Sequence, residues 1–419
     1  MSSPSYPSFN EPAHGVARVG LNYQWGDPAV IEKNLELLGA IQTIKMTEDG
    51  TNTHEKDVYV SNVRSLGSYN IMDAKKLTIV VPGHPRIWSD RPMPYQVPPD
   101  VRPRAYKEVK CKLWHHAMSP LFLAVDRSAQ DQGRDPLDWA SVDFVTDRNN
   151  LRSLLCWILG RDHPKTSRFD LQLAGNKTVI MVASGWRPRT HKFQPGMVTS
   201  SYGFSFEKES TRSYPGLEKS VQHNRVVQYN MSGLNMVVRF EVDGCVLPAE
   251  SNSGSPDSGE GPLALPTESG LSEALSPIHF SMSSTPPSVT VLSGGACVPE
   301  SCILEVTTVK NVKWLETYAQ LFFSQTPHHF SARQAEGTVK QVKKAHITSP
   351  TLQKVEKKLQ PGLKKLRRFL VQLQELVILH GKDQRLSLIY ENKELTLFRM
   401  RNDVCCIPEE YLARFSSKA

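Results

Sequence analysis

The chain has 419 residues, of which 39% are hydrophobic, with a formal net charge of +8 and a pI of about 9.0. This length and composition indicate a globular protein with a substantial hydrophobic core and exclude a chain that is disordered throughout. The basic charge favours an anionic partner such as RNA or DNA, but it is spread over the whole chain and does not identify one.

Targeting and redox features point to an intracellular protein. The first residues have neither the basic start nor the apolar stretch of a signal peptide, and the chain has no apolar run of membrane-spanning length. The seven cysteines are an odd number without a C-x-x-C pair, which is typical of a reducing compartment. We therefore expect a soluble monomer without membrane contact, located in the nucleus, the cytoplasm or both.

The first part of the chain predicts a flexible arm, a buried strand and a helix. Residues 1–15 are polar and contain several prolines, whereas residues 77–83 (LTIVVPG) form the short apolar run of a buried strand. The proline-rich residues 91–104 predict an extended loop. Apolar residues at helical spacing then predict a helix over 147–159, with Asp147 as a candidate cap.

Several strand-like runs follow this helix, and the last of them carries three charged residues. The runs cover residues 169–173, 177–184, 202–207, 225–230 and 235–243, and a short turn between the last two predicts a hairpin. Side-chain alternation in the last strand places Val238, Phe240 and Val242 on one face and Arg239, Glu241 and Asp243 on the other. That charged face is either a solvated, salt-bridged sheet face or part of a metal site, and the strand alone leaves both possibilities open.

The composition then changes before regular patterns return. Residues 248–299 are rich in Ser, Pro and Gly and predict a disordered insertion. Beyond it, residues 302–309 predict a strand and residues 312–325 a helix. A further helix is predicted to open at Pro361, and residues 385–398 predict a second hairpin. The basic residues of that helix are either solvated or in contact with phosphates: Lys364, Lys365, Arg367 and Arg368.

These elements predict one domain. A long loop between two strands of one sheet adds little closure entropy, because that cost grows only logarithmically with loop length. We therefore expect a single α/β (α+β) domain over residues 16–400, interrupted by the insertion at 248–299 and followed by a tail at 401–419. Its expected architecture is a mixed central sheet flanked by helices.

Carboxylates recur on three of the predicted strands. Glu207 ends the strand at 202–207, Glu241 and Asp243 share one strand face, and Glu305 shares a face with Thr307. Hard divalent cations such as Mg²⁺ and Mn²⁺ take carboxylate oxygens as ligands and leave positions for water and phosphate. The sequence therefore predicts a divalent metal site where these strands meet.

The order of these short motifs resembles that of a known family. The motifs are Gly203–Glu207 (GFSFE), Glu241–Asp243 (EVD), Glu305–Thr307 (EVT), residues 142–155 (VDFVTDRNNLRSLL) and residues 319–339 (AQLFFSQTPHHFSARQAEGTV). In their order along the chain, these motifs resemble those of the DXO/Rai family of decapping nucleases, which are RNA 5′-end hydrolases. The TDRNN variant at 146–150 and the long insertion are similar to a divergent fungal branch of that family. The resemblance covers roughly residues 70 to 345 and implies the DXO/Rai-like nuclease fold.

The resemblance also implies roles for individual residues. Glu207, Asp243 and Glu305 would ligate Mg²⁺ or Mn²⁺, and Val306 would add its backbone carbonyl. The catalytic group would comprise Glu241, Glu305 and Thr307, with Glu241 positioning water or a metal. Arg148 would hold a phosphate and Gln320 would shape the pocket for the RNA 5′ end. The implied activities are hydrolysis of triphosphate or defective caps and 5′-to-3′ exonuclease activity, with an exonuclease protein as a potential partner.

Thr307 departs from the family pattern, which has lysine at this position. A neutral hydroxyl supplies no positive charge to the attacking water or to the developing phosphorane, and losing one such contributor typically costs about a hundred- to a thousandfold in rate. Two functions are therefore carried forward. The first is a metal-dependent RNA 5′-end hydrolase, and the second is a catalytically impaired RNA-binding or scaffold protein of the same fold.

Simpler structural roles remain open for each of these residues. Glu207 could be an exposed strand end, Arg148 a residue at the helix start, and Gln320 a polar helix position. The histidine pairs at 115–116 and 328–329 have no companions at zinc-ligand spacing. The chain has no Asp-Asp pair, no phosphate-binding P-loop and no G-x-S-x-G motif, which argues against a prenyl diphosphate synthase, a P-loop enzyme and an α/β-hydrolase.

Overall fold

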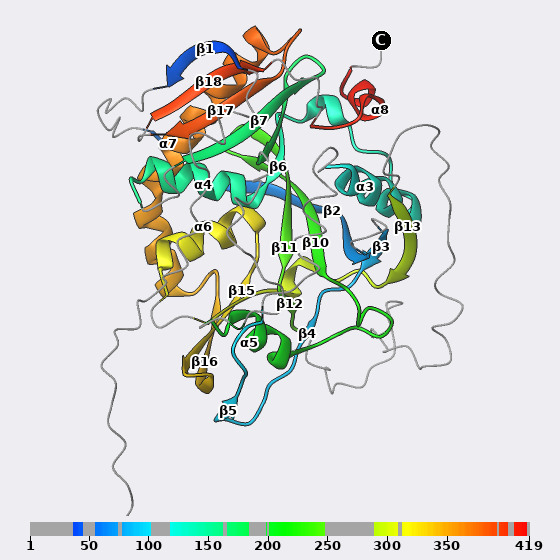
Figure 1. Ribbon diagram of the computed structural model, residues 1–419, viewed down its shortest axis with the longest axis vertical. Helices are drawn as coiled ribbons and strands as arrows, with labels where there is room; N and C mark the ends of the chain where they lie inside the picture. Colours follow the sequence, from blue (N-terminus) through cyan, green and yellow to red (C-terminus); the bar gives the residue numbers. More distant parts are fainter. Residues whose placement is uncertain are drawn as a thin grey trace, which may run out of the picture.

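In a computed structural model, the described residues are 37–44, 55–73, 78–101, 118–161, 166–183, 198, 201–247, 289–308, 312–391, 394–400 and 406–416. They form two mixed sheets with helices on both sides of the larger one (Figure 1). This confirms the fold class predicted from the sequence. The arm predicted at 1–15 and residues 248–288 of the predicted insertion lie outside the described residues. Within the described residues, no helix has the length and apolarity needed to span a membrane.

Within the described residues, the larger sheet has eleven strands. In spatial order they are β1 (Leu37–Ile44), β18 (Glu394–Met400), β17 (Leu386–Glu391), β7 (Thr166–Ala174), β8 (Thr178–Ala183), β6 (Phe144–Asp147), β11 (Leu234–Val242), β10 (Gln222–Met231), β2 (Val60–Asp73), β3 (Thr78–Gly83) and β13 (Thr290–Gly295). The hairpins predicted at 225–243 and 385–398 are present as β10–β11 and β17–β18. At the centre, β6 runs parallel to β11, with Asp147 beside Arg239.

The smaller sheet, again within the described residues, has seven strands. Their order is β5 (Tyr95–Gln96), β16 (Thr338–His346), β15 (His328–Ala335), β14 (Ile303–Thr308), β12 (Gly244–Cys245), β4 (Ile87–Trp88) and β9 (Thr211–Arg212). The chain passes from one sheet to the other directly after β11, because β12 follows it immediately and pairs with β14. The two sheets therefore meet at Asp243.

Strand alternation divides the hydrophobic core between the two faces of the larger sheet. Met236, Val238, Phe240 and Val242 face one core cluster, whereas Val237 faces another. The first cluster is covered by α4 (Arg148–Ile158), α6 (Trp314–Ser324) and α7 (Pro350–His380), and the second by α3 (Ser119–Asp131) and α8 (Glu409–Leu412). Figure 1 shows these two groups of helices on opposite sides of the sheet.

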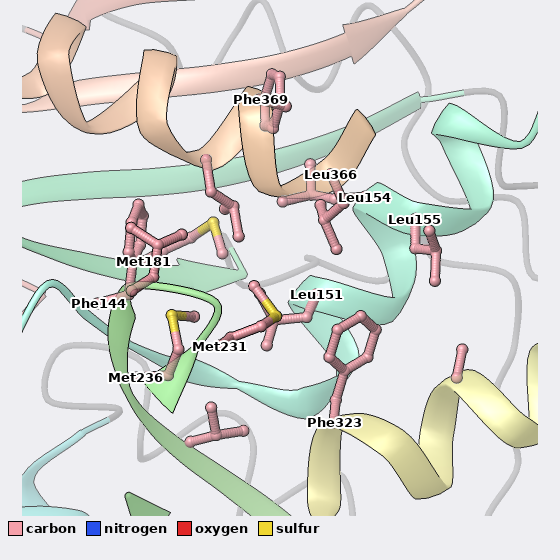
Figure 2. Close-up of a cluster of buried hydrophobic side chains, with 14 of the residues drawn as sticks. Phe144, Leu151, Leu154, Leu155, Met181, Met231, Met236, Phe323, Leu366 and Phe369 are labelled. Carbon is pink, nitrogen blue, oxygen red and sulfur yellow. The ribbon is translucent and has the colours of Figure 1, made fainter. Parts of the chain in front are cut away.

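The first cluster joins helices α4, α6 and α7 to the sheet. Figure 2 shows Leu151 and Leu155 of α4, Phe323 of α6, and Leu366 and Phe369 of α7 among buried side chains. All five are 2% exposed or less, so each helix contributes an apolar stripe at the spacing expected for one buried face. This packing positions α4 and α6, which carry the predicted site residues Arg148 and Gln320.

Two predicted elements differ from the structure. Residues Gly203–Ser210 form the helix α5 rather than a strand. Phe206 is fully buried while Phe204 is 63% exposed, which fits a helix, because a strand would place both rings on one face. The long helix α7 starts at Pro350 and contains Pro361 in its interior. Its leucines on both sides of Pro361 pack into the core, and this burial offsets the backbone hydrogen bond that proline cannot donate.

Two predicted boundaries are also wrong. Strand β13 lies inside the region assigned to the insertion, and it pairs along its whole length with β3. Residues assigned to the C-terminal tail cover the core, since Tyr411 and Phe415 are 3% and 2% exposed, Tyr411 stacks on Phe122, and Phe415 contacts the same ring edge-on. Both segments are ordered because their apolar residues are buried by distant parts of the chain.

The basic residues of α7 make contacts within the protein. Lys364 pairs with Asp57 at 2.8 Å, Arg368 pairs with Glu55, and Arg367 donates to the Ser232 carbonyl at 2.7 Å. These three residues are therefore not merely solvated, as the first alternative held, but bind other segments of the fold.

Candidate active site

Acidic residues gather where the two sheets meet. Glu241 lies near the end of β11, Asp243 lies at the crossing into β12, and Glu305 lies on the neighbouring strand β14. The backbone N–H of Val306 donates to Asp243 Oδ2 at 2.8 Å, which fixes that carboxylate beside β14. Glu207 comes from α5, which packs against β14. The predicted acids therefore converge, although Glu207 reaches the site from a helix and not from a strand.

Glu305 is the buried centre of this group. Its side chain is 6% exposed, and it forms an ion pair with Arg148, whose Nη1 donates to Glu305 Oε2 at 2.8 Å. Gln320 of α6 donates to the other oxygen, Oε1. The structure thus brings Arg148, Gln320 and Glu305 together.

Arg148 is positioned by the central strands. It is the first residue of α4, directly after β6, and its guanidinium lies over the Phe240 ring at 5.8 Å. Its Nε is buried and has no hydrogen-bond partner among the described residues. The guanidinium therefore keeps a donor for a further oxygen in addition to the one used for Glu305.

Arg239 forms a salt bridge with Asp147 of the neighbouring strand β6. Its Nε and Nη2 donate to the two oxygens of Asp147, at 2.7 and 2.9 Å. This salt bridge anchors the Arg239 guanidinium to the neighbouring strand β6.

The acids raise one another's pKa. Burial raises the pKa of Glu207 to about 8, with further contributions from Glu241, Glu305 and Asp100, while Arg86 opposes the rise. Burial also raises the pKa of Asp243 well above its usual range, and Glu305 and Glu207 add to this effect. Buried carboxylates that also repel one another in this way would be stabilised by a bound cation.

The donor set matches a hard divalent cation in its chemistry. All of the gathered donors are oxygens, as Mg²⁺ and Mn²⁺ prefer, and the buried Asp100 Oδ2 has no hydrogen-bond partner among the described residues. Within the same described part of the chain, no group of three or more Asp, Glu, His or Cys side chains is arranged to hold a metal ion as it stands. Glu305 is occupied by Arg148 and Gln320, so a metal would have to draw it away from them.

Thr307 lies beside a buried histidine. Its Oγ1 is 3.1 Å from His329 Nε2, and His329 is completely buried, with the Trp314 ring packed edge-on against it at 5.5 Å. Burial lowers the pKa of His329, although the neighbouring Glu305 opposes this. Strand β15 places His329 in register with Glu305, so an imidazole and a hydroxyl lie beside the acids where the resemblance led us to expect a lysine.

Three residues at the site were missed by the sequence reasoning. Asp100 is 3% exposed and its Oδ1 accepts the Ser205 N–H at 2.8 Å, which holds the start of α5. Arg86 lies near Glu207 and binds Thr211 Oγ1 through Nε at 2.6 Å. His329 is the third. Asp100 and Arg86 belong to no motif, and His329 lies in the motif at 319–339 but was assigned no role there, so contacts between distant segments identify all three.

We expect the stability of the metal-free protein to fall as pH rises from about 5 to 8. The pKa of Glu207 is raised from 4.5 to about 8, so the folded state holds this proton more tightly than the unfolded state. The stability it contributes is therefore complete below the unfolded pKa and is lost as pH approaches the folded value. Adding Mn²⁺ should raise the melting temperature more at the upper end of this range than at the lower end.

Differential scanning fluorimetry across this pH range, with chelator and with Mn²⁺, measures the effect. Glu207→Gln serves as the control, since it removes the titrating group and should flatten the pH dependence. An equal Mn²⁺ shift at both ends of the range would contradict the assignment of these carboxylates to a cation site.

Comparison with solved structures places the fold. Rai1 of S. pombe matches with a TM-score of 0.53 and 13% identity, over 86% of this chain and 99% of that chain. Rai1 of Scheffersomyces stipitis matches with a TM-score of 0.51 and 13% identity, over 90% of this chain and 98% of that chain. Rai1 of Candida albicans matches with a TM-score of 0.50 and 12% identity, over 90% of this chain and 99% of that chain. The fold is the DXO/Rai fold, which confirms the resemblance predicted from the sequence.

A sequence profile of one protein family matches most of the chain. The profile described as Domain of unknown function (DUF8563) matches residues 41–415, which is most of the chain. The protein belongs to this family. No curated protein matches the sequence of this chain significantly.

Proposed function

We propose that the protein is a metal-dependent hydrolase of RNA 5′ ends. The observation that carries this proposal is the convergence of Glu207, Glu241, Asp243 and Glu305 at the junction of the two sheets, with Arg148 and Gln320 on the same carboxylate. The Candida albicans Rai1 structure of the same fold contains pU5 and Mn²⁺, which supports RNA and a divalent cation as ligands.

The chemistry assigned to this chain's residues follows from their positions. Glu207, Asp243 and Glu305, with the Val306 carbonyl, would hold Mg²⁺ or Mn²⁺. When bound, such ions polarise a phosphoryl oxygen and make a water molecule more acidic. Glu241 is exposed at the strand end and would orient the attacking water. The reaction adds this water across a phosphoanhydride or phosphodiester bond and releases the 5′-terminal group.

Arg148 and Gln320 would bind the RNA end. If Glu305 were to ligate a metal, the Arg148 guanidinium would be left to bind a phosphate oxygen in place of the carboxylate. Gln320 loses the same acceptor, so its amide becomes available to the terminal nucleotide. In this exchange the donors of Arg148 and Gln320 would find new acceptors on the RNA end. A buried donor left without an acceptor would cost free energy.

A direct assay tests the proposal. The purified protein is incubated with 5′-triphosphate RNA and with unmethylated-cap RNA in the presence of Mn²⁺, and the released 5′ products are separated. We expect product from at least one RNA, and loss of that product in Glu305→Gln. Absence of product from both RNAs with the wild-type protein would contradict hydrolysis.

Two observations favour a second candidate, an RNA-binding or scaffold protein without turnover. Thr307 supplies no cation, and its hydroxyl is already engaged with His329. Glu305 is held by Arg148 and Gln320 in the arrangement described. If the assay above gives no product while the protein still binds RNA, this second function takes the place of the first.

Thr307→Lys is expected to raise turnover by up to about a hundredfold, because a lysine here would place a positive charge beside the developing phosphorane. Thr307→Met is the matched control, since it lengthens the side chain without adding charge. Initial rates of 5′-product release from triphosphate RNA measure the effect, and melting temperatures show that both variants fold. Equal rates for the lysine and methionine variants would mean that charge at this position does not limit the reaction.

A further inference from the structure

A cavity lies at the far ends of the two helices that reach the acids. Its volume is about 670 Å³, it is open to solvent, and it lies between the end of α4, the start of α6 and the first half of α7. Arg161, Lys313 and Lys358 line it from these three segments, together with Glu316 and Trp314. The carboxylate cluster does not border this cavity, so it is a separate feature of the surface.

The cavity carries an excess of positive charge. Three cationic side chains surround the single carboxylate of Glu316, which lies 3.9 Å from Arg161 and 3.7 Å from Lys313. These are long, partly exposed contacts, and Lys358 has no ion pair within the described part of the chain. Exposed pairs of this kind contribute little stability, so the cations remain available to an anionic ligand.

The same helices connect this cavity to the candidate active site. Helix α4 begins at the site with Arg148 and ends beside Arg161, whereas α6 begins at the cavity with Trp314 and reaches the site at Gln320. At a rise of 1.5 Å per residue, the two features are separated by about 10–15 Å. Trp314 also packs against His329, which contacts Thr307, so one chain of contacts joins the cavity wall to the site.

We propose that this cavity binds the phosphodiester backbone of the RNA strand about three or four nucleotides from its 5′ end. The proposal rests on the proposed function, because it requires the terminal phosphate to lie at Arg148. The separation of about 10–15 Å corresponds to about three or four nucleotides at the 3.4 Å rise of a stacked strand. The half-buried Trp314 indole adds an aromatic surface, and cations beside aromatic rings are the usual means of binding single strands.

Binding measurements with two RNA lengths test the proposal. A 5′-triphosphate dinucleotide reaches only the acids, whereas a 5′-triphosphate octanucleotide also reaches the cavity. Both are titrated against the full-length protein with Ca²⁺ in place of Mn²⁺, so that the acids hold a cation, and the RNA is checked afterwards to be intact. We expect Lys358→Glu and Arg161→Ala each to weaken octanucleotide binding, by about tenfold for the charge reversal, and to lower the salt dependence by about one phosphate contact. Dinucleotide binding should stay unchanged.

The matched control is Lys357→Glu, which makes the same charge change at the next, exposed residue of α7, outside the cavity. It should leave octanucleotide binding within about twofold of the wild type. Equal weakening by Lys357→Glu and Lys358→Glu would overturn the cavity as a site, as would octanucleotide binding that no cavity variant changes.

The outcomes separate this inference from the proposed function. If the wild-type protein cleaves RNA but the cavity variants bind both RNAs normally, the cavity inference fails and hydrolysis stands. If the protein cleaves neither RNA yet Lys358→Glu selectively weakens octanucleotide binding, the cavity stands and hydrolysis fails. If the wild-type protein binds neither RNA, both proposals are overturned.

Discussion

Asp243→Asn is expected to lower the rate of RNA 5′-end hydrolysis by about a thousandfold while leaving the melting temperature unchanged or higher. Asparagine can still accept the Val306 N–H, so the local backbone contact remains. The substitution replaces a buried carboxyl whose pKa is raised, so it relieves repulsion in the metal-free protein wherever that carboxyl is ionised. Activity and stability should therefore change in opposite directions.

Parallel measurements of product release and thermal unfolding test this expectation. Asp383→Asn, in an exposed loop, makes the same chemical change away from the site and should alter neither quantity. A variant Asp243→Asn that retains wild-type turnover would remove Asp243 from the catalytic site. One that unfolds would show that its charge has a structural role.

The second large effect is expected on stability. Arg148→Met should lower the free energy of unfolding by about 3–5 kcal/mol, because it leaves the Glu305 carboxylate buried without its cation. The pair is 2.8 Å apart, and the two side chains are only 8% and 6% exposed, so solvent cannot replace the lost partner. The double variant Arg148→Met/Glu305→Gln should recover most of the loss, since it leaves no unpaired charge.

Urea denaturation of the wild type, both single variants and the double variant completes this cycle. The expected coupling between the two positions is large because they are in direct contact. If the losses of the two single variants simply add in the double variant, the ion pair contributes nothing specific and the buried charge is stabilised by other groups.

Elements with a clear local pattern were predictable from the sequence. Helix α4 carries leucines at helical spacing directly after Asp147, and β10 and β11 alternate around a short turn, so local periodicity alone specifies both. Helix α6 and strand β14 follow the same rule. These are also the elements that carry Arg148, Gln320 and Glu305, which is why these site residues could be placed.

The errors occur where distant contacts override a short local pattern. The five residues from Gly203 alternate as a strand would, but Asp100 accepts an N–H at the start of α5 and the buried Phe206 anchors the helix. Strand β13 has little apolar content of its own, and its pairing with β3 orders it. Neither partner is visible within the local sequence, so no window of the chain could reveal the outcome.

The electrostatics of the site were only partly predictable. The order of the motifs predicted which acids gather, but not that Arg239 pairs with Asp147, nor that His329 occupies the space beside Thr307. Both depend on how neighbouring strands are paired: β6 with β11, and β14 with β15. An interpretation of each strand on its own therefore identifies the charged residues of the site but not the residues with which they pair.

The buried pair of Arg148 and Glu305 links the larger sheet to the smaller one, and it competes with both proposed ligands at once. A metal ion alone would leave the buried Arg148 guanidinium without an anionic partner. A phosphate alone would be repelled by the Glu305 carboxylate. When both ligands bind, the metal ion neutralises Glu305 and the phosphate neutralises Arg148. Cation and RNA end should thus bind with positive coupling, each increasing the affinity for the other by the same factor.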